Sequence, residues 1–202
     1  RCANPTYWIF KGMTMENSLV SGLRSNTVRY GSFSIAIHWL MLLLIAAVFA
    51  CMELKGIFPK GSDSREMMKT GHFMLGLSVL VLAVLRVVFT LMSPVPDIKP
   101  DPARWQKLLA RLMHLALYAF ILGLPLAGWL LLSAAGKPIP FFGLQLPALI
   151  GENQTLAKSI KEIHETGATV GYFLIGFHAA AALYHHYVVR DDTLLRMIPQ
   201  RD

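Results

Sequence analysis

The sequence predicts an all-α fold, an integral membrane bundle of four helices, and two features of the chain lead to this prediction. Of its 202 residues, 54% are hydrophobic and only 15% are charged, with a mean hydropathy of +0.49. A soluble domain has about 25% charged residues. The apolar residues also gather in four runs of about 20 residues, the length that a helix needs to cross the hydrocarbon core of a bilayer.

The four apolar runs define four membrane spans, separated by segments rich in Gly, Pro and charged residues. Gly and Pro favour turns and interrupt helices, so these connecting segments are predicted to be loops. The predicted loops cover residues 55–70, 93–104 and 133–159. The predicted spans cover residues 35–54, 72–92, 108–132 and 168–189.

Residues 1–30 differ in character from the rest of the chain and are predicted to be an N-terminal extension, partly non-native or disordered. Residues 31–202 are predicted to form one membrane domain. The first apolar run starts late, is long enough to span a membrane and lacks a cleavage site made of small residues. It is therefore predicted to be a span rather than a signal peptide.

The basic character of the chain fits a membrane protein better than a nucleic-acid-binding protein. The formal charge is +7 and the isoelectric point is near 9.6, but no basic stripe alternates with aromatic residues. With four spans, twelve of the 19 Lys and Arg residues lie on the side of both termini. Because cytoplasmic loops carry the excess of Lys and Arg, both termini are predicted to be cytoplasmic, and no nucleic acid partner is expected.

Seven histidines occur in this apolar chain, and an ionisable residue inside a membrane span usually serves a function. The most informative are His164 and His178, which lie 14 residues apart on the fourth helix. A helix separates them by roughly 21 Å and keeps them on one face to within about 40°. One metal ion cannot bind both, but two large stacked cofactors can. Haem iron takes axial imidazole ligands, and facing helices of a bundle are where such sites are built.

Depth in the membrane suggests a partner for each histidine of the fourth helix. His72 and His164 lie near the outer ends of their helices, whereas His38 and His178 lie toward the inner ends. This arrangement predicts two bis-histidine haems, an outer one held by His72 and His164 and an inner one held by His38 and His178. His114 lies at about the depth of His38 and is an alternative ligand. It is otherwise a candidate to hydrogen-bond a haem propionate or a quinone.

Small residues lie near these histidines at helical spacing. Gly76 follows His72 by four residues, and Gly167 and Gly171 follow His164 by three and seven. Helical neighbours at these offsets share a face, so the backbone there is open to a flat macrocycle. The other interpretation is helix–helix packing, which is the more common role of small residues in membrane helices.

Transport of a metal ion or of protons is another use of histidines inside a membrane. A transition-metal pathway needs Asp, Glu or Cys beside the histidines. Here Glu53 and Glu165 lie only at helix ends, and Arg86 is the deepest charge. The sequence therefore favours an electron carrier over a transporter. The two differ in their cofactor, because a transporter of this kind is expected to contain no haem.

Short motifs of histidine, glycine, proline and aromatic residues occur in residues 34–39, 52–59, 71–76 and 114–128, and the specific stretch is residues 161–199. In these segments the chain resembles the bacterial cytochrome b561 family of four-helix di-haem membrane cytochromes, and it is most similar to the superoxide oxidase branch. The resemblance covers about residues 34–199. It implies a multi-pass protein of the bacterial inner membrane with two haem b groups, whose iron ligands are His38, His72, His164 and His178.

The similarity to the superoxide oxidase branch implies an enzyme, a superoxide:ubiquinone oxidoreductase. Superoxide gives its electron to the haems at the outer surface and leaves as dioxygen, and membrane ubiquinone becomes ubiquinol. Outer lysines are weak candidates for attracting the superoxide anion, inner polar residues are candidates for contacting quinone, and no catalytic residue is assigned. The lysines are Lys137, Lys158 and Lys161, with Lys55, Lys60 and Lys69 on the same side; the quinone candidates are His114, His185, His186 and Arg86.

The same four ligands also serve an alternative function, an electron-transfer cytochrome b subunit that a partner dehydrogenase or hydrogenase feeds and that reduces quinone. A partner subunit needs a sizeable docking face, whereas superoxide needs only an open, positive approach to the outer haem. The two predicted outer loops contain about 16 and 27 residues, which favours independent action. The expected partners are the lipid bilayer, a membrane quinone and superoxide, with no obligatory protein partner.

Overall fold

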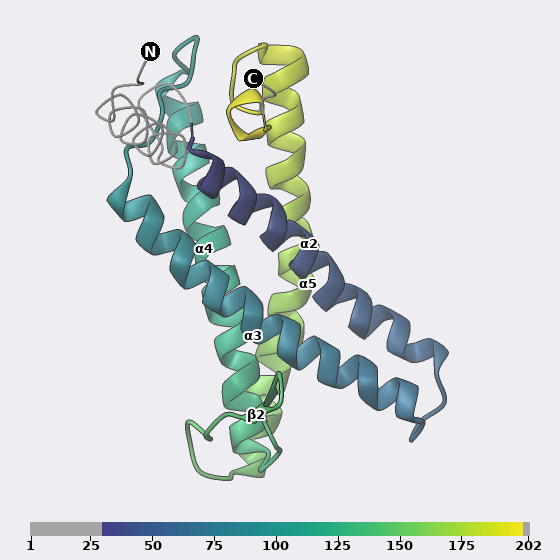
Figure 1. Cartoon of the computed structure of the whole chain (residues 1–202). Helices are drawn as coiled ribbons and strands as arrows, with labels where there is room; N and C mark the ends of the chain where they lie inside the picture. Colours follow the sequence, from purple (N-terminus) through teal and green to yellow (C-terminus); the bar gives the residue numbers. More distant parts are fainter. Residues whose placement is uncertain (1–29, 200–202) are drawn as a thin grey trace, which may run out of the picture.

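The chain forms four long helices that are apolar enough to cross a membrane, as the sequence predicts (Figure 1). The computed structural model describes residues 30–199. Apart from Tyr30, the predicted N-terminal extension lies outside the described residues. The helices are α2 (Ser32–Leu54), α3 (Asp63–Met92), α4 (Arg104–Ala134) and α5 (Gln154–Tyr184).

Short elements connect and follow the helices. Between α4 and α5 lies an antiparallel hairpin with a two-residue turn, in which Gly143 has a φ of 84° that favours glycine. A π-helical segment continues α5. One short 3-10 turn follows α2, and a second one comes after the π-helical segment. These elements are η1 (Lys55–Ile57), β1 (Pro140–Phe141), β2 (Leu144–Gln145), η2 (His185–Val189) and η3 (Leu195–Met197).

Two helices begin well before the predicted spans, so the predicted loops 55–70 and 133–159 are wrong in part. Helix α3 begins at Asp63 after the N-cap Ser62, and α5 begins after the N-cap Asn153. In both cases the side-chain oxygen of the cap accepts a backbone N–H of the first turn. The apolar runs mark the most hydrophobic part of each helix, whereas the caps mark where the helix starts, so a helix can begin several turns before its apolar run.

The helices pair as two antiparallel hairpins that cross each other (Figure 1). Helix α2 packs along α3, α4 packs along α5, and α3 also contacts α4. Helix α5 makes only sparse backbone contact with α2 and α3. A small apolar core forms where α2, α3 and α4 meet. Its buried residues are Ile37, Met41, Val79, Ala83 and Ile121.

Many large apolar side chains point away from this core, as expected for a protein surrounded by lipid. Leu43 and Leu115 are each 67% exposed, and Phe173 is 62% exposed. Such side chains keep apolar surroundings among acyl chains, while each helix satisfies its own backbone hydrogen bonds. The 30 residues of α3 extend about 45 Å, enough to cross a hydrocarbon core of about 30 Å.

The two ends of the bundle differ, and we name them after the predicted orientation. The inner end contains the start of α2, the α3–α4 connection and the C-terminal segment 190–199 (Figure 1). The outer end contains the α2–α3 connection and the β1–β2 hairpin.

The C-terminal segment 190–199 closes the inner end through hydrogen bonds to residues far away in the sequence. The guanidinium of Arg196, which is 9% exposed, donates to the Pro96 carbonyl at 2.5 Å. The indole N–H of Trp39 donates to the Met197 carbonyl at 2.7 Å. The segment thereby joins the start of α2 to the α3–α4 connection.

A buried carboxylate fixes the turn between α5 and this segment. Nδ1 of His185 lies 2.5 Å from Oδ2 of Asp191, and the backbone N–H of Thr193 donates to Oδ1 at 2.9 Å. Burial raises the pKa of the Asp191 carboxyl, but these hydrogen bonds lower it by more, so its pKa lies below the usual value. Asp191 is therefore ionised at neutral pH and holds His185 at the end of the helix.

Replacing Arg196 with Ala is expected to destabilise the inner end. The substitution removes the bond to Pro96 and the contact of Arg196 with Asp192 at 3.4 Å. A hydrogen bond that involves a charged group contributes about 1.5–3 kcal/mol. Thermal unfolding in detergent should therefore show a lower midpoint, with faster proteolysis of the C-terminal segment. The control is Arg104→Ala, which removes an exposed arginine at the same end; an equal loss in both variants would contradict the prediction.

Candidate cofactor site

Two pairs of histidines face each other at different depths of the bundle. The ring centroids of His72 on α3 and His164 on α5 lie 6.1 Å apart. Those of His38 on α2 and His178 on α5 lie 6.2 Å apart. Each pair bridges two helices whose backbones make only sparse contact. The structure thus brings together the same pairs that depth along the sequence suggested.

The separation within each pair fits a metal ion between the two rings. A metal-bound imidazole nitrogen lies about 2 Å from the ion, so two rings on opposite sides of one ion have centroids about 6 Å apart. The observed separations of 6.1 and 6.2 Å match this value. The ring planes are inclined at 78° and 69°, so the rings do not stack on each other. The residues present fit a haem iron with two axial imidazole ligands.

A hydrogen bond orients the ring of His72. Its Nδ1 lies 3.0 Å from the Val48 carbonyl of α2, and because a carbonyl only accepts, Nδ1 carries the proton and Nε2 keeps a free lone pair. Metal-binding histidines generally donate their second N–H in this way. Nδ1 of His164 is buried without a hydrogen bond, although the Leu124 carbonyl is nearby.

His114 lies beside the inner pair but differs from it. Its ring centroid is 5.6 Å from that of His178, a shorter separation than within either pair. The ring interacts with the Ala110 carbonyl of its own helix, and the residue is exposed. By distance His38 is the better partner for His178, and His114 lies at the rim of the inner site.

The glycines near the histidines divide between the two roles that the sequence left open. A Cβ at Gly171 would lie 2.2 Å from the ring of Phe120, and one at Gly167 would lie 2.6 Å from Leu124. Both glycines therefore serve the close packing of α5 against α4, and the macrocycle interpretation is wrong for them. A Cβ at Gly76 would meet no atom within 4 Å, so this position on α3 is open.

The predicted outer lysines differ in their charge partners. Lys137 and Lys158 are exposed, and neither forms an ion pair within residues 30–199. Lys161 pairs with Glu165 at 2.7 Å, which cancels most of its attraction for an anion.

Two other outer lysines also behave differently from each other. Lys69 pairs with Glu66 at 2.6 Å. Lys55 follows α2 directly, and its charge acts on His72. Lys55 is therefore one outer lysine near enough to act on the outer pair.

The four inner candidates for quinone contact do not converge on one point. His185 is held by Asp191, and the ring of His186 packs on a neighbouring tyrosine with centroids 4.8 Å apart. His114 lies at the rim of the inner pair, as described above. Arg86 lies in a separate cleft.

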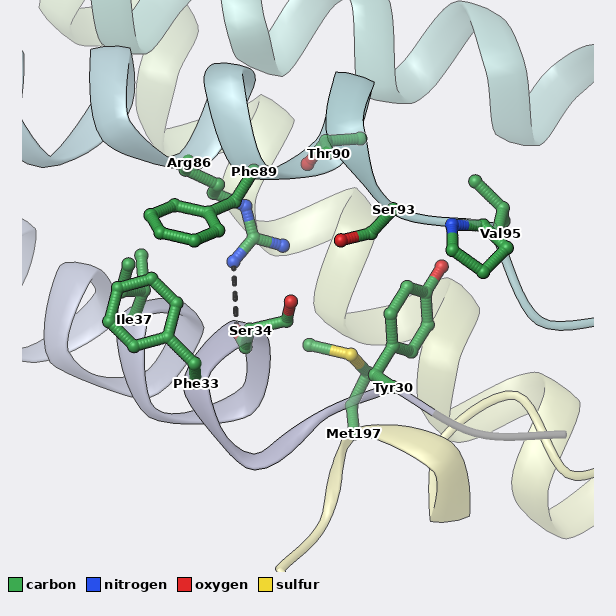
Figure 2. Close-up of a pocket in the computed structure, with 11 residues that line it drawn as sticks. Tyr30, Phe33, Ser34, Ile37, Arg86, Phe89, Thr90, Ser93, Val95 and Met197 are labelled. Carbon is green, nitrogen blue, oxygen red and sulfur yellow. Dashed lines mark hydrogen bonds between the residues drawn. The ribbon is translucent and has the colours of Figure 1, made fainter. Parts of the chain in front are cut away.

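This cleft at the inner end was not indicated by any sequence pattern. Figure 2 shows the guanidinium of Arg86 between α2 and α3, with hydroxyl side chains nearby. The cavity volume is about 30 Å³, roughly the room that two water molecules need. Its lining comes from three segments that are far apart in the chain, which is why no local motif marks it. The polar lining residues are Tyr30, Ser34, Arg86, Thr90 and Ser93.

Four membrane helices that present two facing histidine pairs at different depths define a membrane cytochrome of the b type. Comparison with known proteins gives the family, because the model for prokaryotic cytochrome b561 matches residues 29–200. The chain belongs to the prokaryotic cytochrome b561 family, whose members bind haem b. It is accordingly a multi-pass electron-transfer protein of the bacterial inner membrane.

Individual relatives extend over most of the chain. Cytochrome b561 homolog 1 of Escherichia coli (strain K12) is 43% identical over 173 residues, which cover 86% of this chain and 98% of that protein. "Probable superoxide oxidase CybB" of Yersinia pestis is 39% identical over 173 residues, 86% of this chain and 97% of that protein. Cytochrome b561 homolog 2 of Escherichia coli (strain K12) is 31% identical over 178 residues, 84% of this chain and 91% of that protein.

Gly171→Ala and Gly76→Ala are expected to have opposite effects on the protein prepared without haem. The first substitution forces a methyl group against Phe120 and should destabilise by about 1–3 kcal/mol, the usual cost of overpacking. The second enters open space and should stabilise α3 by up to about 0.5–1 kcal/mol. Thermal unfolding in one detergent measures both. Equal effects of the two substitutions would contradict the packing role assigned to Gly171.

Proposed function

We propose that this chain is a di-haem cytochrome b that oxidises superoxide at the outer surface and reduces ubiquinone in the membrane. The observation that carries the proposal is the presence of two histidine pairs, each at the separation that a bis-histidine iron site requires. The 39% identity to a protein named a probable superoxide oxidase supports the choice of substrate. The proposed ligands are His72 with His164 for the outer haem and His38 with His178 for the inner haem.

The proposed reaction balances over two superoxide anions and one quinone. Each superoxide loses one electron and leaves as dioxygen, while the quinone takes up two electrons and two protons to become the quinol. Haem b, when bound, supplies reversible one-electron chemistry at its iron. Two such sites in one chain suit a substrate that delivers electrons singly to an acceptor that needs a pair.

Helix α5 sets the distance between the two sites. His164 and His178 lie 14 residues apart on this continuous helix, which separates their Cα atoms by about 21 Å. This distance is most of a hydrocarbon core of about 30 Å. Electrons therefore cross most of the membrane within a single chain.

At the outer end, exposed lysines attract the anionic substrate. Positive surface charge raises the local concentration of a small anion and its rate of capture. Lys137 and Lys158 supply such charge, because no described acid pairs with them. The charge of Lys55, which acts on His72, belongs to the same outer surface.

The quinone is proposed to bind at the inner half, beside His114. This residue is exposed and lies next to the inner pair, so a quinone that arrives through the lipid can reach it. An imidazole can also pass the protons that quinone reduction needs. The Arg86 cleft is too small for this purpose, since about 30 Å³ is a tenth or less of a typical ligand pocket.

The proposed orientation directs the inner end toward the cytoplasm. The excess of Lys and Arg on the side of the chain termini supports it. Superoxide then reacts on the opposite side of the inner membrane, and no partner subunit is needed to deliver the electrons.

Each of the four proposed ligands is expected to be required for one haem. His72→Ala and His164→Ala should lose the outer haem, and His38→Ala and His178→Ala should lose the inner one, because one axial bond alone holds the iron weakly. Purified variants should then contain about half of the wild-type haem per chain by a pyridine haemochrome assay. The matched control is His114→Ala, which should keep both haems.

One outcome would change the assignment of the inner ligand. If His38→Ala keeps both haems and His114→Ala loses one, His114 is the partner of His178. If all five variants keep the full haem content, the histidine pairs do not bind the cofactor.

Superoxide is expected to reduce the haem of the purified wild-type protein without quinone, and added ubiquinone should reoxidise it. The visible spectrum follows both steps. A haem that superoxide leaves oxidised, but that a chemical reductant reduces and quinone reoxidises, would contradict the proposed substrate. That result would favour an electron-transfer subunit fed by a partner dehydrogenase or hydrogenase.

Replacing Lys137 and Lys158 together with Gln is expected to slow reduction by superoxide. A charge at about 10 Å in water attracts an anion by roughly 0.4 kcal/mol, so loss of two charges should lower the rate about two- to fourfold at low ionic strength. The difference should disappear at about 1 M salt, where the Debye length is about 3 Å. Stopped-flow absorbance measures the rate. Lys99→Gln, which removes an exposed lysine at the inner end, should leave it unchanged; equal slowing in both would argue against steering.

A further inference from the structure

Arg86 is a cation inside a membrane helix, and no described acid neutralises it. It belongs to α3, and its guanidinium points into the inner cleft (Figure 2). Its hydrogen bond reaches the backbone carbonyl of Ser34 at the long distance of 3.4 Å. None of the ion pairs within residues 30–199 involves it. A charge at this depth is costly unless an anion balances it.

The cleft around Arg86 offers hydroxyl groups and no carboxylate. Tyr30, Thr90 and Ser93 line it together with Arg86 (Figure 2). Hydroxyl groups can donate hydrogen bonds to an anion, but they cannot neutralise a guanidinium. The cleft therefore has the chemistry of an anion site. Its volume of about 30 Å³ admits a group of the size of a carboxylate rather than a ring.

Arg86 is also the charge that the inner histidines share. Its charge acts on His38, on His178 and on His114. The carbonyl that it contacts, that of Ser34, lies one helical turn before His38 on α2. A group held between His38 and His178 would therefore interact electrostatically with the guanidinium of Arg86.

The outer pair has a different electrostatic environment. The charge of Lys55 acts on His72, while the charge of Glu165 acts on His164 with the opposite sign. Charges of both signs thus surround the outer pair, whereas the inner pair faces a cation without a described counter-charge.

We infer that Arg86 binds a carboxylate of the inner haem and thereby holds that haem at a higher reduction potential than the outer one. The inference rests on the proposed function, in particular on an inner haem held by His38 and His178. Haem b carries two carboxylate side chains, so the group itself brings the anion that the cleft lacks, and Arg pairs with carboxylates through strong bidentate hydrogen bonds.

The effect on the potential follows from charge. Reduction of the inner iron adds one electron and makes the site more negative by one unit. A carboxylate without a partner would oppose this step, whereas Arg86 neutralises the carboxylate and stabilises the reduced site. Electrons that enter at the outer pair then collect at the inner pair, next to the proposed quinone position.

The test is a potentiometric titration of the haem-loaded protein, followed by its visible spectrum. Arg86→Gln is expected to lower the midpoint of one haem by at least 59 mV, a tenfold change in its equilibrium constant for reduction, and to leave the other unchanged. Arg86→Lys keeps the charge and should restore most of that midpoint. Lys99→Gln is the matched control at the inner end and should shift neither haem.

The affected haem is identified in single-haem backgrounds. Combined with His164→Ala, which should keep only the inner haem, Arg86→Gln should produce the full shift. Combined with His38→Ala, it should produce none. Shifts of equal size in both backgrounds, or no shift in either, would overturn the inference.

Thermal unfolding provides a second readout that does not depend on electron transfer. In protein prepared without haem, Arg86→Gln removes an unneutralised charge and should unfold at or above the wild-type temperature. In haem-loaded protein the same variant should unfold below it, because the carboxylate loses its partner. A loss of the same size in both forms would show a structural role only and would overturn the proposed contact.

Failure of the proposed function would look different. If superoxide does not reduce the protein but the Arg86→Gln shift is present and confined to the inner haem, the substrate is wrong and the inference stands. If His38→Ala and His114→Ala each keep both haems, neither histidine is needed to hold a haem beside Arg86, and the inference falls with the proposed ligands.

Discussion

The fold and the site depend on one constraint, the fixed spacing of two histidines on a helix that cannot bend freely. A helix in lipid must satisfy its own backbone hydrogen bonds, so the 14 residues between His164 and His178 become a set distance of about 21 Å. Helices α2 and α3 then need to bring only one ring each to the correct depth. Helix α4 has the complementary role, because Gly167 and Gly171 let it pack closely against α5. Helix α4 thus supports α5 by direct packing, whereas α2 and α3 face α5 across the histidine pairs.

The helices and the histidine pairs could be predicted from the sequence because both depend on local, periodic properties. Apolar runs show which residues lie in lipid, and a 3.6-residue repeat shows which side chains share a face. The starts of α3 and α5 could not be predicted in this way, because Ser62 and Asn153 begin them in polar segments. The packing role of Gly171 could not be predicted from the sequence either. It depends on which face of α5 the side chain of Phe120 covers, and tertiary packing determines that face.

The Arg86 cleft shows the same limit of local patterns. In the sequence Arg86 is an isolated charge in an apolar run, and its surroundings come from the start of α2, the end of α3 and the C-terminal segment. The C-terminal segment reaches this place because Trp39 and Arg196 hold it against the inner end. The C-terminal segment is therefore part of the wall of the Arg86 cleft. Its hydrogen bonds support the start of α2, one turn before His38.

Under the proposed orientation, the charges at the two ends also bear on the direction of electron flow. An electron that moves from the outer to the inner pair moves toward the negative side of the membrane, and a full crossing costs about 2.3 kcal/mol per 100 mV. The separation of about 21 Å is roughly two-thirds of the hydrocarbon core, so the cost is about 1.5 kcal/mol per 100 mV.

Exposed lysines at the outer end cannot offset this cost, because each contributes only about 0.4 kcal/mol at 10 Å in water. One charge neutralised at about 8 Å, with an effective dielectric constant near 20, changes the energy of the reduced site by about 2 kcal/mol. Under the proposed function, a single partly buried arginine at the inner pair is therefore of the right size to offset the cost of moving an electron inward against the membrane potential.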